Sequence, residues 1–452
     1  MLRKLLLLFG DISIIVLSTY LAIKIAFSYT TPQQNIDLYY MMLPFNIITA
    51  GIMFNVNGLF SIAKKKYSEL LLSIVVAIFN IFIIMMAFSF FVREFSYSRS
   101  VLVISSLLQV VMLAIWKYAF WRIETFLTEP RSALIIGNEK ECLKMLNKIK
   151  SQPHIRYEVK YVCTDIDSSS WKYVIGTIDL VIVCADLDLK SKAEIVHFCQ
   201  LSEKQVLLAP DVYELFCSGL KLDKIDDIPV FRPQYLKPTL EQRSLKRILD
   251  IIVASVGIGL TWPLMIITAI AIKFDSKGPI LYSQIRTGRI EKEFKVFKFR
   301  SMKVDAEKST GPVMAKEHDN RITRLGNFIR ATRIDELPQL FNVLLGDMSI
   351  VGPRPERPFF VEQFKKEIPE YIYRHNVKPG ITGLAQVYGK YNTTPNDKLI
   401  YDLMYIQSCN FLTDIYIMML TIKILVTKSS TEGIKDFEEE NLSEYEINKE
   451  QC

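Results

Sequence analysis

Long apolar runs constrain this chain more than any other feature of its sequence. Four lie within the first 125 of the 452 residues, and a fifth extends from Ile251 to Ile272. The first four cover about residues 5–27, 38–60, 69–92 and 101–121. A helix needs about 20 residues to cross the ~30 Å hydrocarbon core of a bilayer, so each run is long enough. The sequence therefore predicts four transmembrane helices in residues 1–125.

Basic residues predict the orientation of these helices. Arg3, Lys4 and the run 64–66 flank one side, whereas 30–37 holds no basic residue. Cytoplasmic loops carry an excess of Lys and Arg, so we expect the N-terminus and Arg122 on the cytoplasmic face. The first run lacks a small-residue cleavage site, and we expect it to remain as a helix.

The fifth apolar run has basic residues on both sides, unlike a helix that crosses the membrane once. They are Lys237, Arg243, Lys246 and Arg247 before it, and Lys273, Lys277, Arg286, Arg289 and Lys292 after it. Both ends are therefore expected on the cytoplasmic face. Pro263, near the middle, removes one backbone hydrogen bond and clashes with the preceding turn. We predict a re-entrant membrane helix over residues 241–273, broken at Pro263.

Residues 126–240 alternate short β-branched runs with helical ones. The strands are expected at 133–137, 157–163, 180–184 and 206–208, and the helices at 139–150 and 190–202. Such alternation predicts a parallel sheet of Rossmann-like type. The turn after Gly137 lacks the further glycines of a dinucleotide site and carries Glu139 and Glu141 instead. We expect a degenerate domain without cofactor that regulates the protein or builds a homodimer.

The composition of the chain limits the classes of molecule that it is expected to bind. A net charge of +7 fits anionic lipids or nucleotides, and the chain has no nucleic-acid-binding motif, so we expect no nucleic acid partner. None of the seven cysteines has Cys-x-x-Cys spacing, which favours reduced thiols over disulfides or a metal cluster.

The candidate chemistry lies in residues 274–430, around the acidic pair Asp335-Glu336. A purely local interpretation makes Asp335 the N-cap of a helix that continues through 339–345 and ends at Gly346. Arginines nevertheless surround the pair, at Arg324, Arg330, Arg333, Arg354 and Arg357. The planar guanidinium binds phosphate with two parallel hydrogen bonds, so this setting indicates a phosphate-binding site.

Two further cations precede the pair. Lys298 and Arg300 alternate with phenylalanines in a strand expected at 294–299, so both should point to one side of it. Convergent positive charge suits a nucleotide diphosphate. His375 is the histidine nearest this region, and we expect it to be structural.

The motifs of this region, taken together, resemble those of the bacterial sugar transferases, the monotopic polyprenyl-phosphate phosphoglycosyl transferases. Larger members of that family carry a four-helix unit and a Rossmann-like domain before the transferase part, as this layout does. The motifs extend from about residue 244 to 427. They are Arg247–Asp250, Lys298–Met302, Asp335–Leu337, Phe341–Leu344, Gly346–Ser349, Val351–Pro355, Pro379–Gly383, Ala385–Val387, and Asp402 with Tyr405.

The resemblance implies transfer of hexose 1-phosphate from a UDP-sugar to undecaprenyl phosphate, with release of UMP, as the first membrane step of exopolysaccharide, capsule or O-antigen synthesis. It implies Asp335 as a nucleophile that forms an aspartyl-phosphosugar, and Glu336 as a ligand of Mg²⁺. Lys298, Arg300, Arg330 and Arg354 would hold the phosphates. The location would be the bacterial inner membrane, with the catalytic domain on its cytoplasmic face.

Two other classes of protein stay open. A non-catalytic scaffold or regulator of a polysaccharide assembly complex would use the same membrane unit, but would not need cations clustered around an acidic pair. A nucleotide-sugar oxidoreductase would need the glycine fingerprint that is missing after Ile136. The identity of the hexose is not readable from these residues.

Three departures from the family pattern, and two polar segments, complete the analysis. Trp262 stands where the family has serine before the proline, Lys378 where it usually has arginine, and Leu384 where it usually has tryptophan. Lysine lacks the guanidinium fork, so substrate choice is expected to differ. We expect residues 304–323 to form a mobile loop and the acidic tail, residues 431–452, to be disordered.

Overall fold

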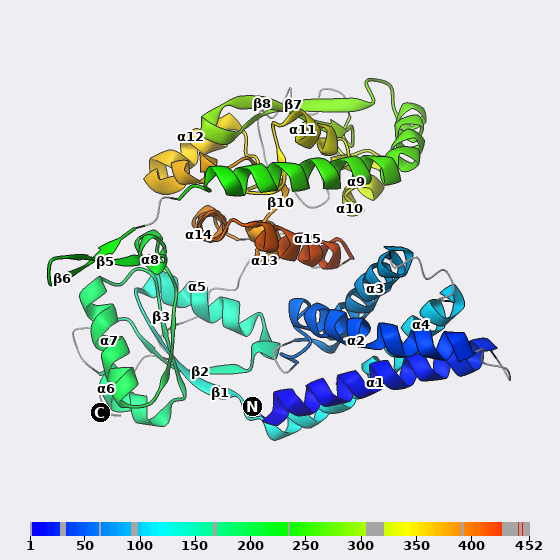
Figure 1. The fold of residues 1–452 in the computed structure, drawn as a ribbon. Helices are drawn as coiled ribbons and strands as arrows, with labels where there is room; N and C mark the ends of the chain where they lie inside the picture. Colours follow the sequence, from blue (N-terminus) through cyan, green and yellow to red (C-terminus); the bar gives the residue numbers. More distant parts are fainter. Residues whose placement is uncertain are drawn as a thin grey trace. The chain divides into compact units, whose positions relative to one another are not determined.

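The computed structural model describes residues 2–27, 33–62, 65–91, 98–165, 170–233, 236–303, 321–389 and 393–426, together with Leu442 and Tyr445. The chain forms two compact units, whose elements are labelled in Figure 1. Unit 1 comprises Met1–Ala209 and Phe437–Cys452, and unit 2 comprises Pro210–Asp436. The contacts thus divide the chain at residue 209, whereas the sequence analysis placed the start of the membrane-anchored part at 241.

The four predicted apolar runs of unit 1 are helices. They are α1 (Leu2–Phe27), α2 (Gln33–Val56), α3 (Tyr67–Phe91) and α4 (Arg99–Leu127). Within the described residues, α1, α3, α4 and α9 of unit 2 are long and apolar enough to span a membrane, and α2 contributes a shorter apolar stretch, Met41–Val56. The chain is therefore a membrane protein.

Helices α1 and α4 are joined by a buried ion pair and by close packing. Lys117 Nζ lies 2.6 Å from Asp11 Oδ2, and neither side chain is more than 1% exposed. Lys117 also donates to the Leu59 carbonyl. Gly10 lies against the Trp116 ring, so that a β-carbon at residue 10 would overlap it. Charged groups inside an apolar bundle are retained only when paired, so this pair fixes the register of the two helices.

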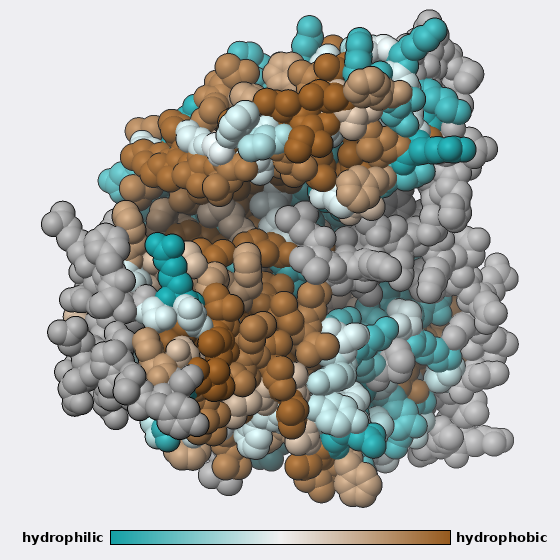
Figure 2. Space-filling model, turned by 90° about the vertical axis from the view of Figure 1, so that its right-hand side faces the viewer, coloured by the Kyte–Doolittle hydropathy of each residue, from teal (hydrophilic) through white to brown (hydrophobic). Residues whose placement is uncertain are grey.

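The outward faces of these helices are apolar. Leu107 and Ile115 of α4 and Phe9 of α1 are 64–73% exposed. Figure 2 shows wide hydrophobic surfaces on the molecule. Exposed apolar area of this extent is typical of protein that contacts lipid.

A four-stranded parallel sheet completes unit 1, as predicted. Its order is β2-β1-β3-β4. The strands are β1 (Arg131–Ile136), β2 (Tyr157–Cys163), β3 (Leu180–Val183) and β4 (Gln205–Leu208), and the main helices are α5 (Glu139–Lys150) and α7 (Leu189–Leu201). Leu134 and Ile136 of β1 face one hydrophobic cluster, and Ala133 and Ile135 face the other. The sheet is therefore buried on both faces, as parallel sheets usually are.

The start of α5 is occupied by a carboxylate of the chain itself. The Asn138 N–H donates to Asp186 Oδ2 at 2.7 Å. A dinucleotide-binding domain would place its pyrophosphate at such a helix start. In this structure the Asp186 carboxylate lies at that helix start instead.

Two residues of the acidic tail pack on this sheet. Leu442 is 5% exposed within the cluster on the α5 side, and the Val162 N–H donates to the Tyr445 carbonyl at 2.7 Å. Lys150 Nζ lies 4.9 Å from the centre of the Tyr445 ring. At these two positions the chain is packed rather than disordered, and the other residues from 431 onward lie outside the described ranges.

Unit 2 begins with α8 (Val212–Ser218) and a hairpin of β5 (Lys221–Ile225) and β6 (Ile228–Arg232). The sequence analysis did not predict this hairpin, because Pro229 and Pro233 make the segment unlike a typical pair of strands. The remaining strands are β7 (Leu281–Thr287), β8 (Glu293–Phe299), β9 (Ser349–Val351) and β10 (Gly380–Thr382), and η3 (Arg289–Glu291) joins β7 to β8. The helices are α9 (Leu240–Asp275), α10 (Arg324–Ala331), η4 (Ile334–Glu336), α11 (Gln339–Leu345), α12 (Pro358–Glu367), η5 (Pro369–Asn376), α13 (Leu384–Tyr388), α14 (Pro395–Gln407) and α15 (Phe411–Val426).

Helix α9 continues through Pro263, the position at which the sequence analysis predicted a break. It is one helix of 36 residues with Pro263 inside it. The Thr261 hydroxyl donates to the Gly257 carbonyl at 2.7 Å, a contact that often bends helices. Figure 1 shows α9 turning away from its first direction before the chain enters β7. The predicted interruption is thus a bend in a continuous helix.

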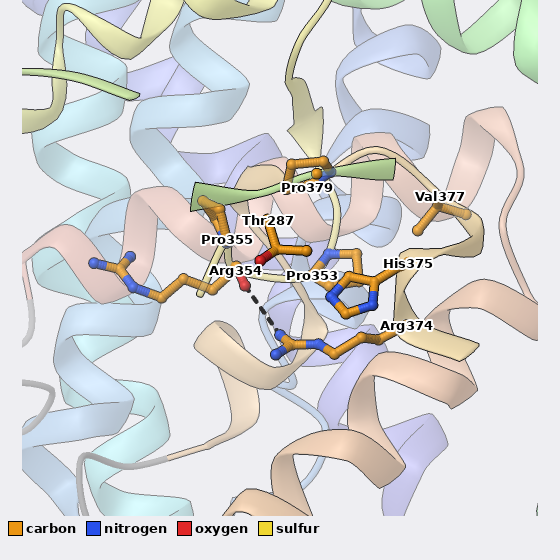
Figure 3. A pocket seen from close by; sticks show the side chains of 9 residues that line it. Thr287, Pro353, Arg354, Pro355, Arg374, His375, Val377 and Pro379 are labelled. Atoms are coloured by element: carbon orange, nitrogen blue, oxygen red, sulfur yellow. Dashed lines mark hydrogen bonds between the residues drawn. The ribbon is translucent and has the colours of Figure 1, made fainter. Parts of the chain in front are cut away.

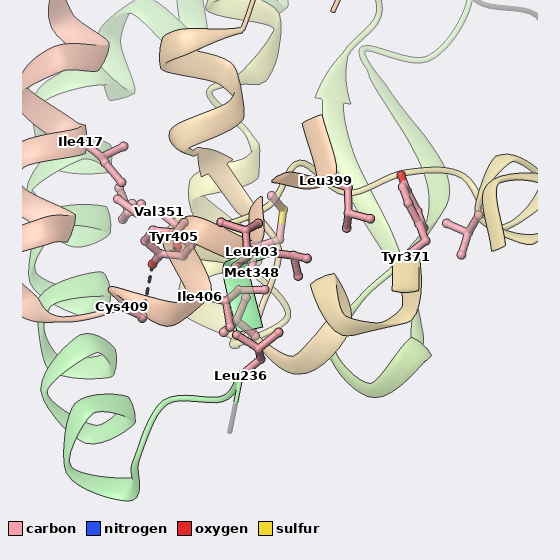
Figure 4. Close-up of a cluster of buried hydrophobic side chains, with 14 of the residues drawn as sticks. Leu236, Met348, Val351, Tyr371, Leu399, Leu403, Tyr405, Ile406, Cys409 and Ile417 are labelled. Atoms are coloured by element: carbon pink, nitrogen blue, oxygen red, sulfur yellow. Dashed lines mark hydrogen bonds between the residues drawn. The ribbon is translucent and has the colours of Figure 1, made fainter. Parts of the chain in front are cut away.

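The core of unit 2 gathers around β9 and α14. Figure 4 shows Val351, Leu403 and Tyr405 together with Met348 and Ile417. Asn342 of α11 is fully buried, accepts from the Phe297 N–H at 3.0 Å and donates to the Lys295 carbonyl at 2.7 Å. This side chain fixes α11 to β8.

Candidate active site

The acidic pair lies in η4, between α10 and α11. Arg333, just before it, has φ 57° and ψ 14°, a left-handed conformation that non-glycine residues rarely adopt. Strained backbone of this kind is concentrated at functional sites. Asp335 is not the N-cap of the following helix, as the local interpretation held, because α11 begins at Gln339 with Pro338 as its N-cap.

Glu336 is held by two cations from other elements. Its Oε1 accepts from Lys298 Nζ of β8 at 2.8 Å and from Arg354 Nη2, beyond β9, at 2.9 Å. Arg333 Nη1 lies 3.9 Å from Oε2. Burial of Glu336 opposes ionisation, but Arg354, Lys298 and Arg333 outweigh it and hold the pKa of this carboxyl well below its usual range. Glu336 is therefore a carboxylate at neutral pH.

Asp335 lies in a different environment, although it is the next residue. It is 8% exposed, and its pKa is raised, first by burial and then by the neighbouring Glu336. Lys298, Arg330 and Arg333 lie close enough to oppose this rise. No described residue donates a hydrogen bond to its carboxylate. Adjacent carboxyls whose pKa values are pushed apart are typical of active sites in which each has its own task.

The structure brings together five of the predicted site residues and separates one. Lys298 and Arg354 donate to Glu336, and Lys298 and Arg330 lie close enough to Asp335 to influence its pKa. Arg300 instead donates through Nη2 to the Ser276 carbonyl at 2.6 Å and through Nη1 to the Lys277 carbonyl at 3.1 Å. Strand β8 ends at Phe299, so the alternation that would have put Arg300 beside Lys298 ends there too. Arg300 has a structural role at the end of α9.

Arg354 stands between two prolines in an unusual segment. Pro353 and Pro355 have no N–H to donate, and a residue before proline is restricted to extended conformations. Figure 3 shows the Arg354 side chain extending away from the neighbouring pocket, while its carbonyl accepts a hydrogen bond from Arg374. The pocket is lined by Thr287, Gly288, Pro353, Arg354, Pro355, Arg374, His375, Val377 and Pro379.

Sequence reasoning missed a buried network under β9. Lys246 Nζ of α9 donates to the Val351 carbonyl at 2.8 Å, to Tyr405 Oη at 2.9 Å and to Asp414 Oδ2 at 2.7 Å. Tyr405 Oη donates to Asp414 Oδ1 at 2.7 Å. Tyr405 and Asp414 are 9 residues apart along the chain, whereas Lys246 lies 105 to 168 residues from its three partners. In the sequence, the only indication of this network is that polar residues occur in otherwise apolar helices.

The carboxylate pair also suits a magnesium ion. In the described residues no three His, Cys, Asp or Glu side chains are arranged as a metal cluster. Mg²⁺ usually keeps several waters and takes one or two carboxylates together with substrate phosphate. Both hydrogen bonds to Glu336 fall on Oε1, which leaves Oε2 for such a ligand role.

Family models match two stretches of the chain. The model described as bacterial sugar transferase matches residues 241–428, which include α9 except for its first residue, Leu240, and every residue of the candidate site. The model described as a CoA-binding domain matches residues 56–187, from the end of α2 to just beyond β3.

Individual relatives extend this similarity. A UDP-N-acetylgalactosamine-undecaprenyl-phosphate N-acetylgalactosaminephosphotransferase of Aeromonas hydrophila is 39% identical over 260 residues, which are 56% of this chain and 60% of that protein. UDP-glucose:undecaprenyl-phosphate glucose-1-phosphate transferases are similar too. The Klebsiella pneumoniae protein is 34% identical over 66% of this chain and 69% of its own length. The Escherichia coli (strain K12) protein is 40% identical over 51% of this chain and 50% of its own length.

The stretch that matches the sugar transferase model contains the acidic pair and its cations. The similarity also continues beyond that region, since it covers more than two thirds of the Klebsiella protein. The chain is accordingly an enzyme of the bacterial sugar transferase family.

Proposed function

We propose that this enzyme transfers hexose 1-phosphate from a UDP-sugar to undecaprenyl phosphate and releases UMP. The reaction would be the first membrane step of exopolysaccharide, capsule or O-antigen synthesis. The observation that carries the proposal is the buried Asp335 beside a carboxylate that Lys298 and Arg354 hold ionised. The names of the relatives, which act on UDP-sugars and undecaprenyl phosphate, support it.

Asp335 is the proposed nucleophile. One of its carboxylate oxygens attacks the β-phosphorus of the UDP-sugar, the bond to the bridging oxygen breaks, and UMP leaves with that electron pair. A phosphate oxygen of undecaprenyl phosphate then attacks the same phosphorus and releases the Asp335 carboxylate. Burial of Asp335 limits its hydration, which favours attack on phosphorus over interaction with water.

Cations do most of the remaining work in phosphoryl transfer, which depends on positioning and on charge stabilisation. Lys298, Arg330 and Arg354 are proposed to hold the phosphate oxygens. Before substrate binds, Lys298 and Arg354 are bonded to Glu336, so binding would redistribute these contacts. Glu336 is proposed to hold Mg²⁺, which would supply further neutralisation of the diphosphate.

The covalent step can be tested directly. Asp335→Asn should abolish UMP release and the lipid-linked product, because the amide oxygen is a poor nucleophile. Purified wild-type protein, quenched with UDP-sugar and Mg²⁺ but no lipid, should gain the mass of a sugar phosphate at Asp335. A variant that keeps more than about a tenth of the wild-type rate, or a donor-treated wild type without the adduct, would point to direct transfer.

The sugar is open, because the relatives' names include both N-acetylgalactosamine and glucose. UMP release measured in parallel with a panel of UDP-hexoses and their N-acetylated forms would identify it. A scaffold protein would release no UMP with any member of the panel.

We also propose that α9 enters and leaves the cytoplasmic leaflet without crossing the bilayer. Near its start, Arg247 donates to the carbonyls of Val343 and Leu344 at 2.6 and 2.8 Å. At its end, the Ser276 carbonyl accepts from Arg300. A straight helix between these two residues would be about 43 Å long, yet both ends bind one small catalytic unit.

Cysteine labelling tests this topology in the inner membrane of intact cells. Cysteines introduced at Arg243 and Lys277 should both be protected from an impermeant thiol reagent and both become labelled in inverted vesicles. Labelling of the two positions from opposite faces would show that α9 spans the membrane.

A further inference from the structure

The backbone around Arg354 is held by side chains from distant elements. The Pro355 carbonyl accepts from Arg286 Nη1 at 3.0 Å, and the Val351 carbonyl accepts from Lys246. The Arg354 carbonyl itself accepts from Arg374 Nη2 at 3.0 Å. The two prolines of this segment have no backbone N–H groups to donate. The position of the segment therefore depends on donors from other elements that bind its carbonyl oxygens.

Arg374 is built into the interior of unit 2. It lies in η5 and is 5% exposed, and its Nη2 is 2.8 Å from Asp402 Oδ2 of α14. Its Nη1 donates to Tyr371 Oη. One nitrogen thus contacts both the Asp402 carboxylate and the Arg354 carbonyl, so the ion pair fixes the donor that reaches Arg354.

The Asp402 carboxylate is buried and forms its ion pair with Arg374. It is 2% exposed, and replacing a buried partner of an ion pair leaves the other charge unpaired. Figure 3 shows Arg374 meeting the backbone of Arg354 from the side opposite to the Arg354 guanidinium. Arg374 therefore acts on the backbone of a residue whose side chain binds Glu336.

We infer that Arg374, oriented by Asp402, is a positioning residue that aims the Arg354 guanidinium at Glu336 and the substrate phosphates. The inference rests on the proposed function for the role of Arg354 in the reaction. A misplacement of about 1 Å at a charge-stabilising group can cost on the order of a hundredfold in rate. Loss of the Arg374 contact should therefore affect turnover more than substrate binding.

A double-mutant cycle separates positioning from general support. Arg374→Lys keeps a positive charge opposite Asp402 but loses the guanidinium fork, and Arg354→Lys does the same at the active site. We expect Arg374→Lys to lower kcat for UMP release at least about tenfold in the wild-type background, with a smaller change in KM. In the Arg354→Lys background the same change should cost less than about twofold, because the geometry that it protects is already lost.

Leu399→Ala provides the matched control. Leu399 is fully buried in α14, one turn before Asp402, and contacts neither arginine through a hydrogen bond. This variant should lower the unfolding temperature at least as much as Arg374→Lys, yet leave kcat of the folded enzyme within about twofold of wild type. Equal losses of kcat from Arg374→Lys in both Arg354 backgrounds would overturn the inference.

Amide hydrogen exchange gives a readout that does not depend on activity. In wild-type protein the Gly352 N–H donates to the Thr382 carbonyl at 2.8 Å. Exchange in the peptide 350–357 should become faster in Arg374→Lys than in Leu399→Ala. Unchanged exchange in Arg374→Lys would reject the positioning role. A wild-type enzyme that released no UMP would reject the proposed function instead, and the exchange comparison would still decide the structural claim.

Discussion

The pKa values of two neighbouring carboxyls, Asp335 and Glu336, are shifted in opposite directions in this protein. Two cations stabilise the charge of Glu336, whereas Asp335 is buried beside a like charge. Because a raised pKa favours the protonated form in the folded state, the stability that Asp335 contributes is present below about pH 3.8 and is lost as pH rises through the raised pKa. The stability that Glu336 contributes is present above about pH 4.5 and is lost only in strong acid.

Replacing these two carboxyls by amides should therefore shift stability in opposite directions. At about pH 7 in metal-free buffer, Asp335→Asn should raise the unfolding temperature, because it removes a buried charge. Glu336→Gln should lower the free energy of unfolding by about 3 kcal/mol, because it leaves Lys298 and Arg354 without their anion. Thermal unfolding of the purified proteins in detergent checks both signs, and a fall for both variants would contradict the assignment.

His375 should give the protein an acid-sensitive component of stability. Burial, with Arg374 and Lys365 nearby, lowers its pKa to about 3, so the folded chain keeps it neutral while the unfolded chain binds a proton below about pH 6.5. Stability should thus fall as pH falls between these values, by about 2 kcal/mol at pH 5.

The measurement is denaturant unfolding at a series of pH values. His375→Gln should flatten the dependence between about pH 6.5 and 5, while His197→Gln, at an exposed position of α7, should leave it unchanged. An equal slope in His375→Gln and wild type would remove His375 as the cause.

At this scale the sequence predicted five residues that the structure brings together around the acidic pair, and it missed contacts between residues that are distant along the chain. Asp335, Glu336, Lys298, Arg330 and Arg354 were predicted from the cations around an acidic pair and from the resemblance to the bacterial sugar transferases. Arg300 was misplaced, since one residue beyond a strand end its direction is set by the next segment. The pairs Arg374–Asp402 and Lys246–Asp414 join residues 28 and 168 positions apart, and only the folded chain reveals them.

At the scale of elements, helix periodicity and strand alternation predicted most boundaries. Helix α5 begins and ends where expected, and α11 ends at Gly346, whose φ of +94° suits glycine. Pro263, where the sequence analysis predicted a break, lies inside a continuous α9, because one missing hydrogen bond bends a long helix without ending it. The segment 304–320, expected to be a loop, lies outside the described residues.

We expect the ion pair between α1 and α4 to contribute to the stability of the membrane helices. Lys117→Met should destabilise the protein by about 3 kcal/mol, because Asp11 is left buried and unpaired. Combining it with Asp11→Leu should restore much of the loss. Arg3→Ala is the control, since the Arg3–Glu124 pair is half-exposed on the Arg3 side and should matter less.

The fraction of monodisperse protein after heating in detergent measures this effect. A double variant less stable than both single variants would show that the two charges do not act as a pair.

At the scale of the whole molecule, every residue of the candidate site belongs to unit 2. We therefore predict that residues 210–436, expressed alone, insert into membranes through α9 and release UMP from the UDP-sugar at no less than about a tenth of the full-length rate. Asp335→Asn in the fragment is the control for background. A well-folded fragment without activity would show that unit 1 contributes to catalysis.

The sequence anticipated the membrane helices, the parallel sheet and the catalytic region in order, but not where contacts divide them. The sequence analysis assigned residues 210–240 to the Rossmann-like domain that it placed at residues 126–240. In the folded chain Val212 and Leu215 join the core around β9, and Gln407 donates to the Leu215 carbonyl at 3.1 Å. Such long-range packing has no signature in local periodicity.

The return of Leu442 and Tyr445 to the sheet of unit 1 has a consequence for biosynthesis. The sheet itself is encoded before residue 210, but the residues that cover part of its α5 side leave the ribosome more than 200 codons later. At about 5–20 residues per second, that delay amounts to roughly 10–50 s. During that interval the nascent chain exposes an apolar patch that only the finished polypeptide can close, so premature termination anywhere downstream would leave a recognisable target for chaperones and proteases.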